Sequence, residues 1–126
     1  MNENELAGLL ESLKRMGSDD LSVEVKESAT TLSRDVWETV SAFANTAGGI
    51  IVLGVSERVG FVPVENFETE KVLNQFVAGM GDAGGRGKLA NPPKYTIERV
   101  ELRGTVVLVI TIEELDPSSK PCYVIE

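Results

Sequence analysis

Residues 50–55, Ile-Ile-Val-Leu-Gly-Val, form a nearly continuous run of β-branched and aliphatic side chains. A short run without polar alternation is typical of a strand that is covered on both faces, in the middle of a sheet. The segment before it, residues 34–47, carries apolar side chains at helical spacing, with Ser33 as its expected N-cap, and Gly48-Gly49 separates the two. The centre of the chain therefore predicts a helix that ends at paired glycines and leads into a buried central strand.

The flanking patterns predict the remaining elements. A leucine stripe over residues 3–16 and apolar spacing over residues 69–80 indicate two further helices. Alternation over residues 21–26 indicates a half-buried strand. Residues 95–102 and 105–112 flank Arg103-Gly104 as a β-hairpin, with shorter strands expected at residues 61–64 and from Cys122 onward. Together these patterns predict an α+β fold, a mixed β-sheet with about three helices.

Length and composition limit the organisation of the protein and its chemistry. The 126 residues suit one domain, with residues 1–18 as an N-terminal helix and residues 19–126 as the core. Because the chain ends where a strand begins, we expect it to be the N-terminal part of a longer protein. There is no histidine and a single cysteine, which excludes Ser-His-Asp and Cys-His sites within the chain. The lone cysteine and the lack of a signal or membrane-helix pattern favour a cytoplasmic protein without a membrane partner.

The net charge of −8 opposes binding to a polyanion, but the basic residues are unevenly placed. Between Asp82 and Glu98 the chain carries Arg86, Lys88 and Lys94 and no acid, within and after a segment of five glycines and two prolines at residues 79–93. Glycine lets a backbone approach phosphates closely, and the neighbouring Tyr95 could stack on a base. The alternative for this segment is a solvated, disordered loop.

The order of several motifs resembles a known family. These motifs are Val-Glu-Val-Lys at 23–26, Ala-Phe-Ala-Asn-Thr-Ala-Gly-Gly at 42–49, Ile-Val-Leu-Gly-Val at 51–55 and Lys-Pro-Cys-Tyr-Val at 120–124. They resemble the Schlafen-type AlbA domain, described as a DNA-binding or divergent ATPase-like domain, over residues 19–126. The segment 42–55 carries most of the specificity. The chain departs from the family pattern at Val25, where an aromatic residue is usual, and at Ser56-Glu57, where an aspartate pair is common.

The resemblance implies a catalytic and metal site. Some animal Schlafen proteins are tRNA and rRNA endonucleases with three clustered acids, and the matching positions here are Asp19, Glu24 and Glu57. Such acids would bind Mg²⁺ or Mn²⁺, and Lys26 on the same strand face would stabilise charge at phosphorus. The alternative is an exposed strand face with a Glu24–Lys26 pair and a solvated turn. We favour that alternative, because carboxylates are abundant in this chain.

Asn45, Gly48 and Gly49 form a second motif with two interpretations. Backbone N–H groups at paired glycines could cradle a phosphate. However, the motif follows the C-terminus of a helix, the negative end of its dipole, which disfavours an anion. We therefore favour a C-capping turn in which Asn45 bonds local backbone, and the sequence gives no support for ATP binding.

Three functions remain open. We prefer a nucleic-acid-binding module, for DNA rather than RNA, in a bacterial transcriptional-regulator-like protein, with no cofactor and not an enzyme. Its binding residues would be Arg86, Lys88, Lys94 and Tyr95. The first alternative is a metal-dependent RNA endonuclease of the Schlafen type, which would need Mg²⁺ or Mn²⁺. The second alternative is a dimerisation or protein-interaction module. A homodimer is also a candidate assembly for this chain.

Overall fold

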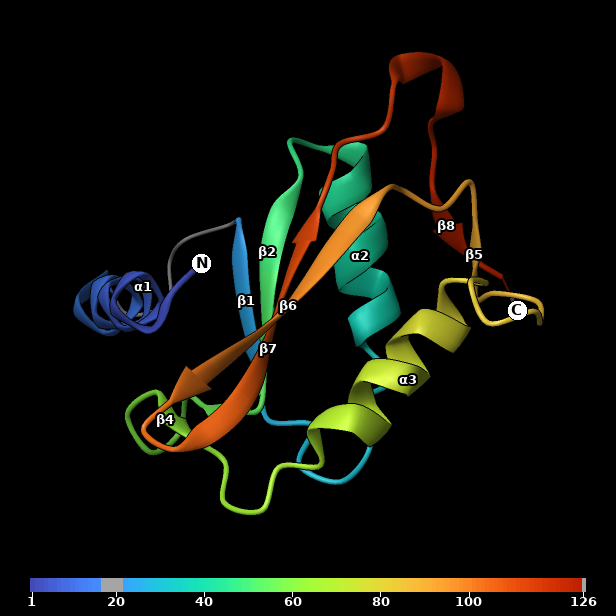
Figure 1. The fold of residues 1–126 in the computed structure, drawn as a ribbon. Helices are drawn as coiled ribbons and strands as arrows, with labels where there is room; N and C mark the ends of the chain where they lie inside the picture. The colour runs from blue at the N-terminus through green and yellow to red at the C-terminus, as the bar shows by residue number, and fades with distance from the viewer. Residues whose placement is uncertain (17–21, 126) are drawn as a thin grey trace.

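The computed structural model describes residues 1–16 and 22–125, which form helices on both faces of a mixed sheet (Figure 1). The α-helices are α1 (Glu3–Met16), α2 (Val36–Asn45) and α3 (Thr69–Gly79), and a 3₁₀ turn spans Pro117–Ser119. The strands are β1 (Val23–Lys26), β2 (Gly49–Leu53), β3 (Val55–Ser56), β4 (Val62–Pro63), β5 (Leu89–Ala90), β6 (Tyr95–Leu102), β7 (Thr105–Ile112) and β8 (Tyr123–Val124). The predicted α+β class is confirmed.

The main sheet has the strand order β1-β2-β7-β6, with β1 parallel to β2 and the other neighbours antiparallel. The central position of β2 agrees with its uninterrupted apolar sequence. Two smaller sheets pair β3 with β4 and β5 with β8. Because β8 lies beside β5, the end of the described chain is anchored next to the segment that follows α3 (Figure 1).

Alternate residues of the central strands face two separate cores. Ile51, Leu53 and Ile110 pack with α2 and α3, whereas Val52 and Val109 pack with α1 on the opposite face of the sheet. Period-two alternation along a strand sends successive side chains to opposite faces, so strands that are apolar at every position fill both cores. Figure 1 shows the resulting arrangement, with α1 on one side of the sheet and α2 and α3 on the other.

The hairpin prediction is confirmed at the residue level. Strand β6 ends at Leu102 and strand β7 begins at Thr105. The turn residues between them, Arg103 and Gly104, both have positive φ, at 49° and 84°. This backbone twist matches the twist of the flanking strands in a type I′ turn. The N–H of Arg103 donates to the Glu3 carboxylate at 3.0 Å, which joins the start of α1 to the turn.

Several predicted boundaries are corrected. Helix α2 begins after Asp35, because the Ser33 carbonyl accepts a hydrogen bond from the Val36 N–H in a preceding turn, so the expected capping role of Ser33 is wrong. The loop expected over residues 79–93 contains the two-residue strand β5. Residues 17–21, which include Asp19 of the candidate metal site and Leu21 of the predicted strand, lie outside the described residues. No helix in the described part of the chain has the length and apolar character needed to span a membrane.

Candidate nucleic-acid interface

Backbone hydrogen bonds fold the glycine-rich segment 80–88 back onto the C-terminal end of α3. The Lys88 N–H donates to the Gly79 carbonyl at 2.7 Å, and the Gly81 N–H donates to the Ala78 carbonyl at 3.0 Å. A Cβ at Gly87 would lie 2.9 Å from the Gly81 nitrogen, a contact that real side chains avoid. The absence of a side chain at Gly87 therefore permits this close return of the chain.

The far end of the segment is held by the end of the described chain. The Ile125 N–H donates to the Lys88 carbonyl at 2.8 Å, next to the paired strands β5 and β8. Lys88 is thus bonded through its N–H to α3 and through its carbonyl to the β8 segment. These bonds fix the backbone from which the Lys88 side chain projects.

Arg86 and Lys88 share a surface hollow of about 410 Å³ with Arg34, which precedes α2. We call it the basic hollow. It is lined by Thr31, Leu32, Arg34, Trp37, Gln75, Ala78, Gly79, Arg86 and Lys88. None of these residues is acidic. Among the described residues, no carboxylate lies within ion-pair distance of Arg34, Arg86 or Lys88.

Several other basic residues have acidic partners. Arg99 makes two hydrogen bonds to the Glu70 carboxylate, at 2.7 and 2.8 Å, and this pairing lowers the pKa of Glu70. Arg58 contacts Glu27 at 3.3 Å. Sequence spacing alone does not relate Arg34, Arg58 or Arg99 to the glycine-rich segment. The structure adds only Arg34 to it, since Arg58 and Arg99 are engaged with carboxylates elsewhere.

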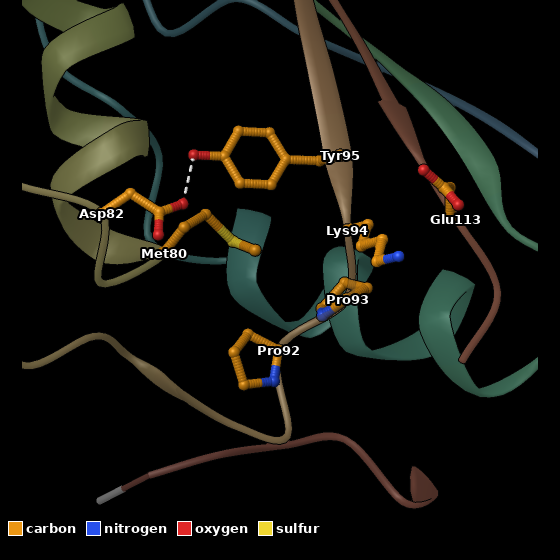
Figure 2. Close-up of a pocket in the computed structure, with 7 residues that line it drawn as sticks. All are labelled: Met80, Asp82, Pro92, Pro93, Lys94, Tyr95 and Glu113. Atoms are coloured by element: carbon orange, nitrogen blue, oxygen red, sulfur yellow. Dashed lines mark hydrogen bonds between the residues drawn. The ribbon is translucent and has the colours of Figure 1, made fainter. Parts of the chain in front are cut away.

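Lys94 and Tyr95 line a different hollow, of about 630 Å³, together with Asp82 and Glu113 (Figure 2). The Tyr95 hydroxyl donates to Asp82 at 2.7 Å, and its ring meets Phe76 edge-on at a centroid distance of 5.4 Å. Burial, followed by the hydrogen bond to Asp82, raises the pKa of Tyr95 to about 12. The predicted binding set is therefore divided between two hollows. The larger one carries charges of both signs and suits a polyanion less well.

Of the acidic positions suggested by the resemblance, Glu24 lies beside a largely covered lysine, Lys26. The Lys26 ammonium lies 3.1 Å from Asp35 and 3.6 Å from Glu24, and only 9% of the Lys26 side chain is exposed. Burial alone would raise the pKa of Asp35, but the hydrogen bond from Lys26 helps to hold it below its ordinary value. Lys26 thus ties β1 to the start of α2. This contact favours a structural role for Glu24 and Lys26 over a catalytic one.

The described residues alone do not supply a three-acid metal site. Glu57 is exposed in the turn after β3, and the neighbouring Ser56 hydroxyl donates to Glu27 at 3.0 Å. No group of three or more Cys, Asp or Glu side chains that could hold a metal ion occurs within residues 1–16 and 22–125. Asp19 lies outside these ranges, so a site completed by Asp19 stays a prediction.

Asn45 and the paired glycines have structural contacts that link distant parts of the chain. The Asn45 side chain accepts a hydrogen bond from the Cys122 N–H at 2.7 Å and donates one to the Cys122 carbonyl at 2.9 Å. The Gly48 N–H donates to the Phe43 carbonyl at 2.8 Å, and φ at Gly48 is +77°. A Cβ at Gly49 would lie 2.6 Å from the Phe43 ring. This geometry favours the capping interpretation, although Asn45 bonds remote rather than local backbone.

Comparisons with known proteins place this geometry among related domains. The chain is similar to the N-terminal domain of a protein from Nitrosomonas europaea whose name relates it to the ATP-dependent DNA helicase RecG. That structure has a TM-score of 0.70 and 26% identity, and the match covers 93% of this chain and 78% of the other. No curated protein matches the sequence.

A weaker similarity is to the DIP2311 protein from Corynebacterium diphtheriae. Its TM-score is 0.44 at 15% identity, and the match covers 94% of this chain but 23% of the other, so it carries no further argument. The family indicated by residues 42–55 is confirmed, since the match to it extends over most of the sequence. Residues 19–123 match the family described as Schlafen, AlbA_2, and the chain belongs to that family.

Proposed function

We propose that this domain binds nucleic acid, preferably DNA, through the basic hollow, as the nucleic-acid-contacting part of a transcriptional-regulator-like protein. The observation that carries the proposal is the convergence of Arg34, Arg86 and Lys88 on a surface where no lining residue is acidic. Two of these side chains are guanidinium groups, which make paired hydrogen bonds to phosphate oxygens. The family and the name of the Nitrosomonas neighbour, which refers to a DNA helicase, support the same class of ligand.

The net charge of −8 is compatible with this proposal because charges act locally in salt solution. At physiological ionic strength the potential of an exposed charge decays over about 8 Å. The carboxylates paired with Arg58, Arg99 and Lys26 are already partly neutralised at their own positions. A phosphate at the basic hollow would respond mainly to the three nearby cations. The distant acids would slow association at low salt and, because salt screens their repulsion, would partly offset the loss of affinity as salt rises.

The proposal is tested by fluorescence anisotropy with labelled single-stranded and duplex DNA and with tRNA, at two salt concentrations. A variant carrying Arg34→Ala, Arg86→Ala and Lys88→Ala should bind at least about tenfold more weakly at low salt. The slope of log affinity against log salt should fall by about 3 in magnitude. Undetectable binding of all three nucleic acids by the wild-type protein at low salt would refute the proposal.

The matched control removes three positive charges from the opposite face of the sheet, by Lys14→Ala, Arg15→Ala and Arg103→Asn. Asparagine tolerates the positive φ of 49° at residue 103. The control variant has the same net charge as the hollow variant. At the higher, near-physiological salt concentration its affinity should stay within about twofold of the wild-type value, because exposed charges are screened over about 8 Å there. Equal losses in the two variants would show that overall charge, and not the hollow, determines binding.

A further inference from the structure

Part of the lining of the basic hollow is apolar. Binding to phosphate alone would not require an apolar surface. The apolar lining residues are Leu32, Trp37 and Ala78, which we call the floor, and the cationic lining residues are Arg34, Arg86 and Lys88, which we call the rim. The volume of the hollow, about 410 Å³, is in the range of small-molecule sites, which are typically about 300–1,000 Å³. A flat patch of lysine and arginine suffices to hold a phosphodiester backbone. A hollow with an apolar floor and a cationic rim instead matches a ligand that has one apolar planar part and one anionic part.

The floor is fixed by close packing. The Trp37 ring stacks on Phe76 at a centroid distance of 5.3 Å and an interplanar angle of 24°. A Cβ at Gly79 would lie 2.0 Å from Trp37 Cζ2, so the glycine allows the indole to lie directly against α3. The Leu32 N–H donates to the Gln75 side-chain oxygen at 2.8 Å, which holds the segment before α2 against the same helix.

The rim comes from two segments whose backbones are also held in place. Arg34 lies between Leu32 and the start of α2, and Lys88 is hydrogen-bonded to Gly79. Both Arg86 and Arg34 carry planar guanidinium groups, which can bind phosphate through their edges and lie against a nucleobase through their faces. A site whose parts are already positioned loses less conformational entropy when a ligand binds.

We propose that the basic hollow accepts an unpaired nucleotide of a single strand, with its base against the apolar floor and its phosphates on the cationic rim. This inference rests on the proposed function and specifies its substrate. A duplex keeps its bases stacked inside the helix and must flip one out, at an energetic cost, before a base can reach the floor. The domain therefore prefers single strands, overhangs or frayed ends over intact duplex.

The inference is tested by competition against a labelled oligothymidylate of about ten nucleotides. The competitors are unlabelled oligothymidylate, a backbone of the same length and charge in which every nucleotide is abasic, and a blunt hairpin duplex. The base-bearing single strand should compete at least about tenfold more strongly than the other two. Equal competition by the abasic strand or by the duplex would overturn the inference while leaving phosphate binding, and so the proposed function, intact. Failure of the labelled strand to bind would refute the inference, and it would refute the proposed function as well only if duplex DNA and tRNA also failed to bind.

A substitution in the floor separates contact with the base from contact with phosphate. Ala78 is exposed on α3, so Ala78→Leu adds bulk to the hollow without disturbing the core. The variant should lose most of the tenfold preference for base-bearing over abasic strands, while its affinity for the abasic strand stays within about twofold. Asn74→Leu, one turn earlier on α3 and outside the lining, is the control and should keep the preference. An unchanged preference in Ala78→Leu would contradict the proposed position of the base.

Discussion

At the scale of single residues, the family motif around Asn45 holds the end of the described chain against α2. The two hydrogen bonds between the Asn45 side chain and the Cys122 backbone join positions 77 residues apart. Cys122 is buried, and burial raises the pKa of its thiol, so it behaves as a small packed side chain and not as a nucleophile. The motif therefore stabilises the β5–β8 region, which lies next to the basic hollow.

Asn45→Ala tests this role. Removing the amide leaves the N–H and carbonyl of Cys122 without these partners in a partly buried position, which should lower the free energy of unfolding by about 1–3 kcal/mol. Asn74→Ala, on an exposed surface of α3, is the control and should change the free energy by less than about 0.5 kcal/mol. Urea denaturation measures both values, and similar effects in the two variants would contradict the assigned role.

Tyr95 gives a second prediction at the residue scale. Tyr123→Phe leaves Tyr95 as the only tyrosine of the chain, so ultraviolet absorbance then follows its ionisation alone. The midpoint of the Tyr95 titration should lie near pH 12, because burial and the Asp82 hydrogen bond favour the neutral hydroxyl. The folded pKa is above the unfolded value of about 10, so this contribution to stability is complete below pH 10 and is lost as the pH rises towards 12. A midpoint near 10 in the folded protein would show that the hydroxyl is solvated.

At the scale of elements, periodicity predicts the longer segments well. The leucine stripe gives both bounds of α1, and the Arg103-Gly104 turn gives both strands of the hairpin. The short strand β5 could not be predicted, because two residues carry no measurable alternation and their pairing with β8 is a long-range contact. Helix α2 begins later than predicted for a similar reason, since the hydrogen bonds of the preceding turn compete with capping by Ser33.

Helix α1 provides the prediction at this scale. Leu10 is 4% exposed in the core between α1 and the sheet, whereas Met16, on the same predicted stripe, is 51% exposed. Leu10→Ala should lower the free energy of unfolding by about 2–5 kcal/mol, through lost burial and the cavity left behind. Met16→Ala should change it by less than about 0.5 kcal/mol. Equal effects in thermal or urea denaturation would mean that α1 does not pack on the sheet as described.

At the scale of the whole molecule, the sequence predicts the family and the basic character of one segment, but not the assembly of the site. Arg86 and Lys88 were candidates because no acid is near them in the sequence. The position of Arg34 depends on how α2 and α3 pack, and the separation of Lys94 and Tyr95 depends on the direction of β6. Neither is encoded in local spacing. The division of basic residues into paired and unpaired sets is likewise a property of the folded surface.

The central claim is that the basic hollow is the place where nucleic acid binds. It is tested most directly by recording ¹H–¹⁵N NMR spectra while an oligothymidylate is added. The largest shifts should fall on the Trp37 indole N–H, the amides of Gly79 and Lys88, and the side-chain Nε–H groups of Arg34 and Arg86. Shifts concentrated on Asp82, Lys94 and Glu113, or on α1, would contradict the claim, as would a spectrum unchanged at low salt.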